Sequence, residues 1–222
     1  MKKAILIMIL LSAIFSACRK KTEDVSIVAP VGHPTIALIG TPVSSTPVGS
    51  GTFTDPGAVG YNDITGDSVP LSAPTSNDVD LTTPGFYSVV WSFTISNGYV
   101  DYTATKPRLV LVTPVNPAAD YSGVYARVSN GVQVNFTKIG PGLYAIDNIG
   151  GVAGATPDDY MFTVYLGQPS DTTLEAPLQP NNLGGEITIE NGTFSVSASD
   201  TSFSYKVDGA GFGPATRVFS HQ

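Results

Sequence analysis

A strict alternation of side chains over residues 86–95 constrains the fold more than any other feature of the sequence. Every second position there holds a large apolar or aromatic residue: Tyr87, Val89, Trp91, Phe93 and Ile95. A period of two with one apolar face is typical of a β-strand that covers a core. We therefore expect this face, including Trp91, to be buried. Asn97-Gly98 follows and favours a tight hairpin, with residues 99–105 as the returning strand.

The composition extends this prediction to the whole chain. Glycine (23 residues) and proline (17) are frequent, charged residues make up only 13%, and no segment shows a sustained helical period. This combination is typical of an all-β protein. Further strands are expected at 35–39, 108–112, 132–136, 144–146, 160–166 and 203–207, and a hairpin at Asn191-Gly192, where Ile187 and Ile189 would face Phe194 and Val196.

Two prolines mark a division of the chain. Pro114 and Pro117 lie in residues 114–119, where they remove backbone donors and favour an extended linker. Before the linker, short alternating segments are typical of an antiparallel sandwich. After it, residues 120–222 hold six or more expected strands, which would form a second antiparallel β-sandwich or a small barrel.

The first eighteen residues have the layout of an export signal. Lys2 and Lys3 open the chain, an uncharged and mostly apolar run extends to Ala17, and Cys18, the single cysteine, follows. The run is shorter than the about 20 apolar residues that span a bilayer, so residues 1–17 are predicted to be a cleaved signal peptide. An ordinary secretory signal with an incidental cysteine is the alternative.

The segment Ser16-Ala17-Cys18 resembles the lipobox of bacterial lipoproteins. That resemblance implies that the thiol of Cys18 carries a diacylglycerol, that cleavage occurs just before it, and that the new amino terminus is acylated. Several acyl chains make a durable membrane anchor. Residues 18–32, which are polar at first and include two acids, would then be a lipidated tether. A charged and acidic segment just after the lipidated cysteine resembles the signal by which lipoproteins of the Bacteroidota are displayed on the outer face of the outer membrane.

A second resemblance covers residues 33–113. The turn Phe53-Thr54-Asp55-Pro56-Gly57, the strand entry Thr83-Pro84-Gly85-Phe86-Tyr87 and the later Ser96-Asn97-Gly98 are similar to bacterial immunoglobulin-like modules of surface lipoproteins. The resemblance implies a sandwich that serves as a spacer or a binding module without catalysis. Residues 120–125 and 142–151 resemble C-terminal β domains of unknown function in Bacteroidota lipoproteins.

Charge and cysteine content limit the partners and the stabilising devices. The net charge is −7, and removal of residues 1–17, which hold two lysines and no acids, makes it −9. Such a surface repels nucleic acid. With Cys18 lipidated no disulfide can form, so the folded part must be stabilised by burial alone.

The residues that usually perform catalysis are few and poorly placed. The two histidines, His33 and His221, lie near opposite ends of the folded part, too few for a zinc site and without the pattern of a nucleophilic triad. The adjacent Asp158-Asp159 would point to opposite sides of an extended chain, whereas Glu186 and Glu190 share a parity and favour a solvated face over a glycosidase pair. We expect no enzymatic activity.

Two sets of residues could bind ligands. Oxygen donors near one end of the first sandwich, which a Ca²⁺ ion would favour, are Asp55, Asp63 and Asp67. The alternative is that each aspartate caps its own turn. Aromatic residues beside turns or out of phase with their strands, on which a sugar ring could stack, are Tyr61, Tyr99, Tyr160 and Tyr165.

These observations lead to one functional hypothesis and two alternatives. Lipoproteins of this build resemble accessory components of polysaccharide-utilisation systems, so the resemblance implies a non-catalytic, outer-membrane, cell-surface protein that binds glycan. The first alternative is a structural or adhesive module that binds protein, such as a transporter complex. The second is a small glycoside hydrolase.

Overall fold

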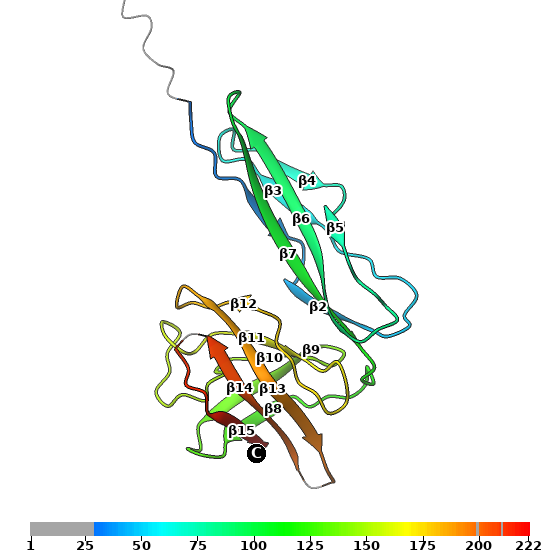
Figure 1. The fold of residues 1–222 in the computed structure, drawn as a ribbon, viewed down its shortest axis with the longest axis vertical. Coiled ribbons are helices and arrows are strands. Elements are labelled where there is room, and N and C mark those ends of the chain that lie inside the picture. Colours follow the sequence, from blue (N-terminus) through cyan, green and yellow to red (C-terminus); the bar gives the residue numbers. More distant parts are fainter. Residues whose placement is uncertain (1–28, 199, 210) are drawn as a thin grey trace, which may run out of the picture. The chain divides into compact units, whose positions relative to one another are not determined.

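A computed structural model describes residues 29–198, 200–209 and 211–222. The regular elements of this part of the chain are all β-strands (Figure 1). Residues 32–222 form one compact unit. No helix in the described residues is long and apolar enough to cross a membrane. The prediction of an all-β protein is confirmed.

Seven strands between residues 35 and 113 form two small sheets. The three-stranded sheet has the order β1–β3–β4 and consists of β1 (Thr35–Leu38), β3 (Ala58–Tyr61) and β4 (Ser68–Leu71). The four-stranded sheet has the order β2–β7–β6–β5 and consists of β2 (Val43–Pro47), β5 (Ser76–Asn77), β6 (Gly85–Ser96) and β7 (Asp101–Thr113). This is the expected two-sheet sandwich, hereafter the N-terminal sandwich.

The long β6–β7 hairpin supplies much of the core of this sandwich. Val89, Trp91 and Ile95 are at most 4% exposed, as the alternation predicted, whereas Tyr87 and Phe93 of the same face are half-buried. Val89 and Trp91 belong to a cluster that includes Ile36 of β1 and Val110 of β7. The hairpin turn begins at Asn97-Gly98, as expected, and the N–H of Asn97 donates to the carbonyl of Val100.

Strand β7 differs from the prediction, because one continuous strand replaces the two expected at 99–105 and 108–112. Pro107 lies within it, opposite Val90. The Val90 carbonyl accepts a hydrogen bond from the N–H of Thr75, on the side away from β7. The missing N–H of Pro107 would therefore point away from β6, and on that side β2 pairs with β7 only from Leu109 onward. A proline is tolerated where no partner strand needs its donor.

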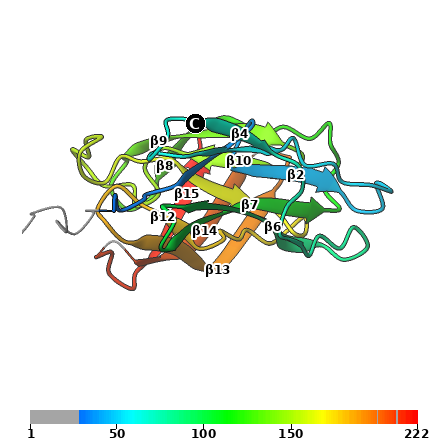
Figure 2. The same cartoon turned by 90° about the horizontal axis from the view of Figure 1, so that it is seen from above.

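The pairing of β2 with β7 is also unexpected. The two strands run parallel and side by side, from Val43 opposite Leu109 to Pro47 opposite Thr113 (Figure 2). The expectation of purely antiparallel pairing in this part of the chain is therefore wrong at one edge.

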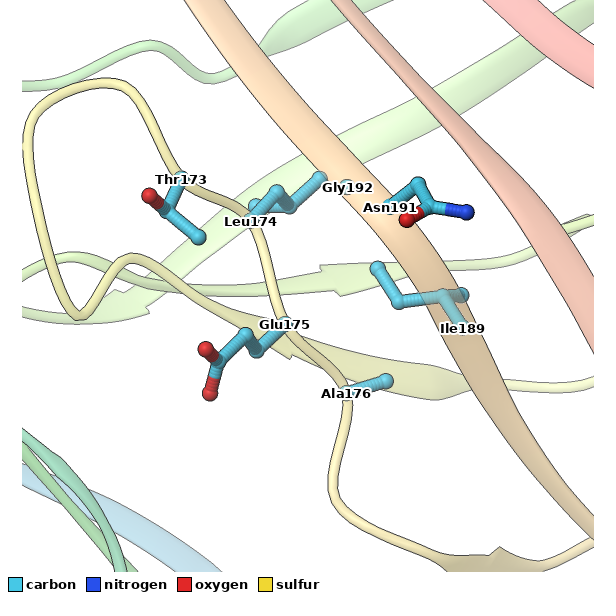
Figure 3. A pocket seen from close by; sticks show the side chains of 7 residues that line it. All are labelled: Thr173, Leu174, Glu175, Ala176, Ile189, Asn191 and Gly192. Carbon is cyan, nitrogen blue, oxygen red and sulfur yellow. The ribbon is translucent and has the colours of Figure 1, made fainter.

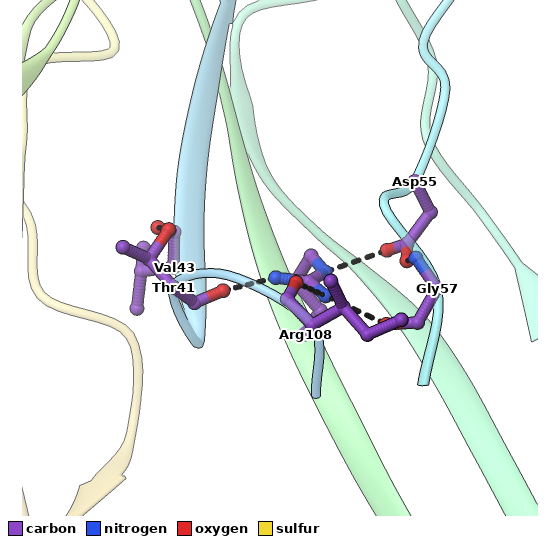
Figure 4. A network of polar contacts seen from close by, with 6 residues as sticks. Thr41, Val43, Asp55, Gly57 and Arg108 are labelled. Atoms are coloured by element: carbon purple, nitrogen blue, oxygen red, sulfur yellow. Dashed lines mark hydrogen bonds and ion pairs between the residues drawn. The ribbon is translucent and has the colours of Figure 1, made fainter. Parts of the chain in front are cut away.

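Arg108, on β7, joins three segments of the N-terminal sandwich. Its Nε donates to Asp55 Oδ2 at 2.7 Å, and the same guanidinium donates to the carbonyls of Ile39, Thr41 and Gly57 (Figure 4). The side chains of Arg108 and Asp55 are 1% and 8% exposed. A charge buried to this degree is tolerable only when it is paired and hydrogen-bonded, and both conditions are met.

Eight strands from residue 123 onward form one antiparallel sheet that nearly closes into a barrel. A small barrel was one of the two architectures expected for this part of the chain. The sheet order is β11–β10–β9–β8–β15–β14–β13–β12. Its strands are β8 (Gly123–Arg127), β9 (Gln133–Gly140), β10 (Leu143–Ile146), β11 (Val164–Gly167), β12 (Gln179–Pro180), β13 (Glu186–Val196), β14 (Thr201–Gly209) and β15 (Thr216–His221).

The segment between β11 and β12 closes this barrel. Glu175 and Gly167 exchange both backbone hydrogen bonds, while Leu174 donates to the carbonyl of Gly192 on β13. The buried side chain of Gln179 completes the seam, because its amide accepts from the N–H of Tyr165 and donates to the carbonyl of the same residue. One side chain thus provides the two hydrogen bonds that a neighbouring strand would otherwise provide.

The expected hairpin at Asn191-Gly192 is absent from the described chain, since both residues lie inside β13. The register of β13 against β14 shifts between Glu190 and Thr193, which marks a bulge. Asn191 takes the positive φ of 52°. A Cβ at Gly192 would overlap the carbonyl of Leu174, so only glycine fits beside the closing segment. The actual β13–β14 turn follows Val196, and β11 is shorter than the expected strand 160–166.

Aromatic rings fill the barrel. Phe203 on β14 lies at the centre of the group, with ring centroids 4.8 to 6.5 Å away in Tyr125, Phe136, Phe194, Tyr205 and Phe219. Burial raises the pKa of Tyr144, at the edge of this group, to about 12. Packing of large aromatic rings thus forms much of the core of the barrel.

The expected linker 114–119 is partly buried. Val115 is 3% exposed, and the hydroxyl of Thr113 donates to the carbonyl of Gln168 at 2.6 Å. Val43, Leu111 and Leu143 form a further buried cluster. The boundary between an N-terminal and a C-terminal domain at 114–119 stays a prediction.

Candidate functional site

A pocket of about 280 Å³ on the barrel combines an aromatic ring with charged groups, and we call it the Phe212 pocket. It is lined by Glu190 on β13, by Lys206, Val207 and Asp208 on β14, and by Phe212 and Pro214 in the loop before β15. Glu190 and Lys206 are direct cross-strand neighbours. Alternation places Glu190, Lys206 and Asp208 on the outer face, while Val207 turns into the core.

The ring of Phe212 is held from several sides. Its centroid lies 5.2 Å from that of Tyr160, with 57° between the ring planes. The guanidinium carbon of Arg217 lies 5.0 Å from the centroid of Phe212. Gly150 leaves no room for a side chain beside the ring. Phe212 is therefore a partly exposed ring in a defined position.

Two arginine side chains bind the backbone around this ring. Arg217 is 5% exposed and donates to the carbonyls of Gly150, Gly213 and Ala215. Arg127 donates to the carbonyls of Gly150 and Gly151. Burial, and then the nearby charge of Arg127, lower the pKa of Arg217. These contacts hold the loops on both sides of Phe212.

A second pocket, of about 400 Å³, lies at the seam of the barrel (Figure 3). Its lining residues are Thr173, Leu174, Glu175, Ala176, Ile189, Asn191 and Gly192. None of these seven residues is aromatic, and the carboxylate of Glu175 points away from Asn191 (Figure 3). The pocket follows from the bulge of β13 beside the closing segment, so a structural origin accounts for it.

A third hollow, of about 250 Å³, is mainly apolar, and we call it the apolar groove. Its apolar lining includes Pro42, Pro107, Leu109, Tyr165, Leu178 and Pro180. Lys106 is the one charged residue among those that line it. Leu178 is 58% exposed. An exposed apolar surface of this kind can mark a protein contact.

The four tyrosines predicted to bind ligand do not form one platform. Tyr160 contacts Phe212, and Tyr165 lines the apolar groove. Tyr61 and Tyr99 belong to the N-terminal sandwich, where they are 43% and 71% exposed. Trp91, at 3% exposure, is a core residue as expected.

The three aspartates predicted to bind Ca²⁺ have separate hydrogen-bond partners. Asp55 pairs with Arg108 and accepts from the N–H of Gly57. Asp63 accepts from the N–H of His33, and the carbonyl of Asp67 accepts from the N–H of Asn62. Within residues 29–198, 200–209 and 211–222, no group of three or more His, Cys, Asp or Glu side chains could hold a metal ion. The calcium hypothesis gains no support from this arrangement.

The other residues considered for chemistry have structural contacts. The ring of His221 packs edge-on against Tyr125, with 5.0 Å between centroids. Asp159 accepts from the N–H groups of Thr156 and Tyr160, and these bonds lower the pKa of its carboxyl. Glu186 and Glu190 are exposed on β13. Cys18 lies outside the described residues.

Sequence reasoning missed Phe212, the central residue of the first pocket. Its segment, Gly209-Ala210-Gly211-Phe212-Gly213, has the composition of a turn. The N–H of Phe212 does donate to the carbonyl of Gly209, so a turn is present. A single large ring between glycines was the available signal, because a turn without a binding or packing role rarely needs one.

The comparisons with known proteins do not assign a family or a function to this chain. No protein-family model matches the chain, and no curated protein matches it. Among solved structures, a crystal structure of the lipoprotein BT2262 from Bacteroides thetaiotaomicron is similar to this chain, with 21% sequence identity and a TM-score of 0.39 over 86% of this chain and all of that one. A likeness at this level does not assign a function.

Proposed function

We propose that this chain is a lipid-anchored protein of the outer membrane, displayed on the cell surface, which captures glycan with its Phe212 pocket. The export signal and Cys18 support the address. The observation that carries the binding site is the contact between Tyr160 and Phe212 beside Glu190, Lys206 and Asp208.

The chemistry of the pocket suits a sugar. The C–H face of a sugar ring packs on an aromatic ring, and carboxylate and ammonium groups bind its hydroxyls. Phe212 provides the ring, and Glu190, Lys206 and Asp208 provide both acceptors and donors. A volume of about 280 Å³ lies just below the usual range for ligand pockets, about 300–1,000 Å³. The pocket therefore fits the end or one face of a glycan better than a long buried segment.

The same geometry supports binding without catalysis. A carboxyl group that acts as a general acid in glycoside hydrolysis is usually held in apolar surroundings. Both Glu190 and Asp208 are solvent-exposed. Exposed carboxylates favour hydrogen bonds to hydroxyls over proton transfer, so we propose capture and not hydrolysis.

Replacement of Phe212 by alanine is expected to weaken glycan binding by about thirtyfold or more, because loss of a central aromatic contact commonly costs about 2 kcal/mol or more. The measurement is binding of residues 25–222 to an array of bacterial and plant polysaccharides, followed by titration of the best binder. Asp208→Asn is a second variant at an exposed position. It should weaken binding without affecting the fold, since it removes only a charged hydrogen-bond acceptor.

Leu178→Ser, in the apolar groove, is the matched control and should leave glycan binding unchanged. The protein-binding alternative is favoured by the exposed apolar surface of that groove and predicts the opposite pattern. Glycan binding that survives both Phe212→Ala and Asp208→Asn would rule out the Phe212 pocket. Absence of glycan binding, together with binding of a transporter protein that Leu178→Ser abolishes, would favour the alternative.

A further inference from the structure

The β6–β7 hairpin ends in a tight turn (Figure 1), and two apolar side chains at this tip are exposed to solvent. Tyr99 is 71% exposed and Val100 is 53% exposed, the largest values among the large hydrophobic residues of this sandwich. Asn97 fixes the turn, because its side-chain oxygen accepts from the N–H groups of both residues at 2.9 Å. The pair is therefore held in place on an ordered turn, and the exposure does not result from an irregular loop.

This tip lies at the end of the sandwich where residue 32 packs. A Cβ on Gly32 would lie 2.8 Å from side-chain atoms of both Ile95 and Tyr102. Those two residues pair with one another one position below the last pair of the hairpin. Cys18 precedes Gly32 by 14 residues. Fourteen residues span at most about 50 Å even when fully extended, so an anchor at Cys18 would limit the distance of this end from the membrane.

We propose that the tip formed by Tyr99 and Val100 inserts into the headgroup region of the membrane that carries the lipid anchor. The inference rests on the lipidated Cys18 of the proposed function. Tyrosine is enriched at the membrane interface because its ring is apolar and its hydroxyl is polar. Two side chains bury too little area to bind alone. The anchor, however, raises their effective concentration at the surface and converts a weak contact into a stable orientation.

The charges around the tip indicate the kind of lipid. Asp101 follows Val100 directly, and Asp63 and Asp67 lie in the turn whose Ile64 side chain also reaches Gly32. Acidic groups at this end disfavour an anionic surface. The headgroups of a zwitterionic bilayer are therefore a suitable partner for the tip itself.

The test measures the fluorescence of a tryptophan introduced at the tip of the anchored protein. Cys18 is the single cysteine, so residues 18–222 can be coupled through it to a maleimide lipid in phosphatidylcholine vesicles. This coupling supplies the anchor whether or not the cell does, and it does not involve the Phe212 pocket. Tyr99→Trp is compared with Val128→Trp, at a barrel position that is 66% exposed. Trp91 is buried and contributes the same background to both variants.

Brominated lipids should quench Tyr99→Trp at least about twofold more than Val128→Trp, since an interfacial ring lies within reach of the acyl chains. Addition of Val100→Ser should reduce the quenching toward that of the control. Equal quenching at the two positions, or a Tyr99→Trp emission that does not change on coupling to vesicles, would overturn the proposal.

Discussion

Replacement of Arg108 by methionine is expected to destabilise the protein by about 3–5 kcal/mol, because it leaves a buried carboxylate without its partner. Asp55 is 8% exposed, and the carbonyls of Ile39, Thr41 and Gly57 would also lose their donor. The network connects the segment between β1 and β2, the turn at 55–57 and strand β7. Urea denaturation of residues 25–222 measures the loss as a fall in the free energy of unfolding.

Lys106→Met is the matched control, since Lys106 lies two residues earlier on the same strand and is exposed. It should change the free energy of unfolding by no more than about 0.5 kcal/mol. The double variant Asp55→Asn with Arg108→Met should lose less than the sum of the two single variants, because each removes the same ion pair. Equal small losses for Arg108→Met and Lys106→Met would contradict the structural role given to this network.

Replacement of Phe203 by alanine should destabilise the barrel by about 3–5 kcal/mol, the usual cost of removing a buried ring and leaving a cavity. Phe203 is 2% exposed and touches rings from β8, β9, β13 and β15. Its loss therefore affects strands on both sides of β14. Thermal and urea unfolding followed by near-ultraviolet circular dichroism would show both the lower stability and the loss of ordered aromatic packing.

Val218→Ala, on the neighbouring strand β15, provides the comparison. Val218 is 43% exposed, so its truncation should cost no more than about 0.5 kcal/mol. A Phe203→Ala variant that unfolds like the Val218→Ala variant would mean that the ring cluster does not determine the stability of the barrel.

The sequence predicted those parts of the fold that depend on local pattern. The alternation around Trp91 identified a core face, and Asn97-Gly98 identified the turn of the longest hairpin. Both signals act between near neighbours in the chain, so they can be interpreted without knowledge of the rest of the structure. The strand order of the barrel depends on distant pairings and was not predicted, and the barrel itself was given only as an alternative to a second sandwich.

The errors have a common physical cause, because the role of a turn residue depends on its partner strand. Asn191-Gly192 forms a bulge because the closing segment passes directly beside Gly192. Pro107 does not end β7 because no strand needs its N–H at that point. Neither partner is visible in the local sequence, so a hairpin was expected at Asn191-Gly192 and a break between strands was expected around Pro107.

The candidate site was predicted only in part. Tyr160 was chosen for its position near a turn, and the structure places it against Phe212. Phe212 was missed because its position depends on Gly150, which is distant in the sequence, and on Arg217, which belongs to the next strand. Neither contact can be inferred from the local sequence. The buried Arg108 had no local signal either, since its partner Asp55 is 53 residues away.

The lipid on Cys18 is the premise on which surface capture and membrane docking both depend. Mass spectrometry of the mature protein, extracted from the membranes of cells that express it, tests that premise directly. We expect a chain that begins at Cys18, with a diacylglycerol thioether on the sulfur and an acylated amino terminus. A free thiol at Cys18, or a mature chain that begins at another residue, would contradict the account.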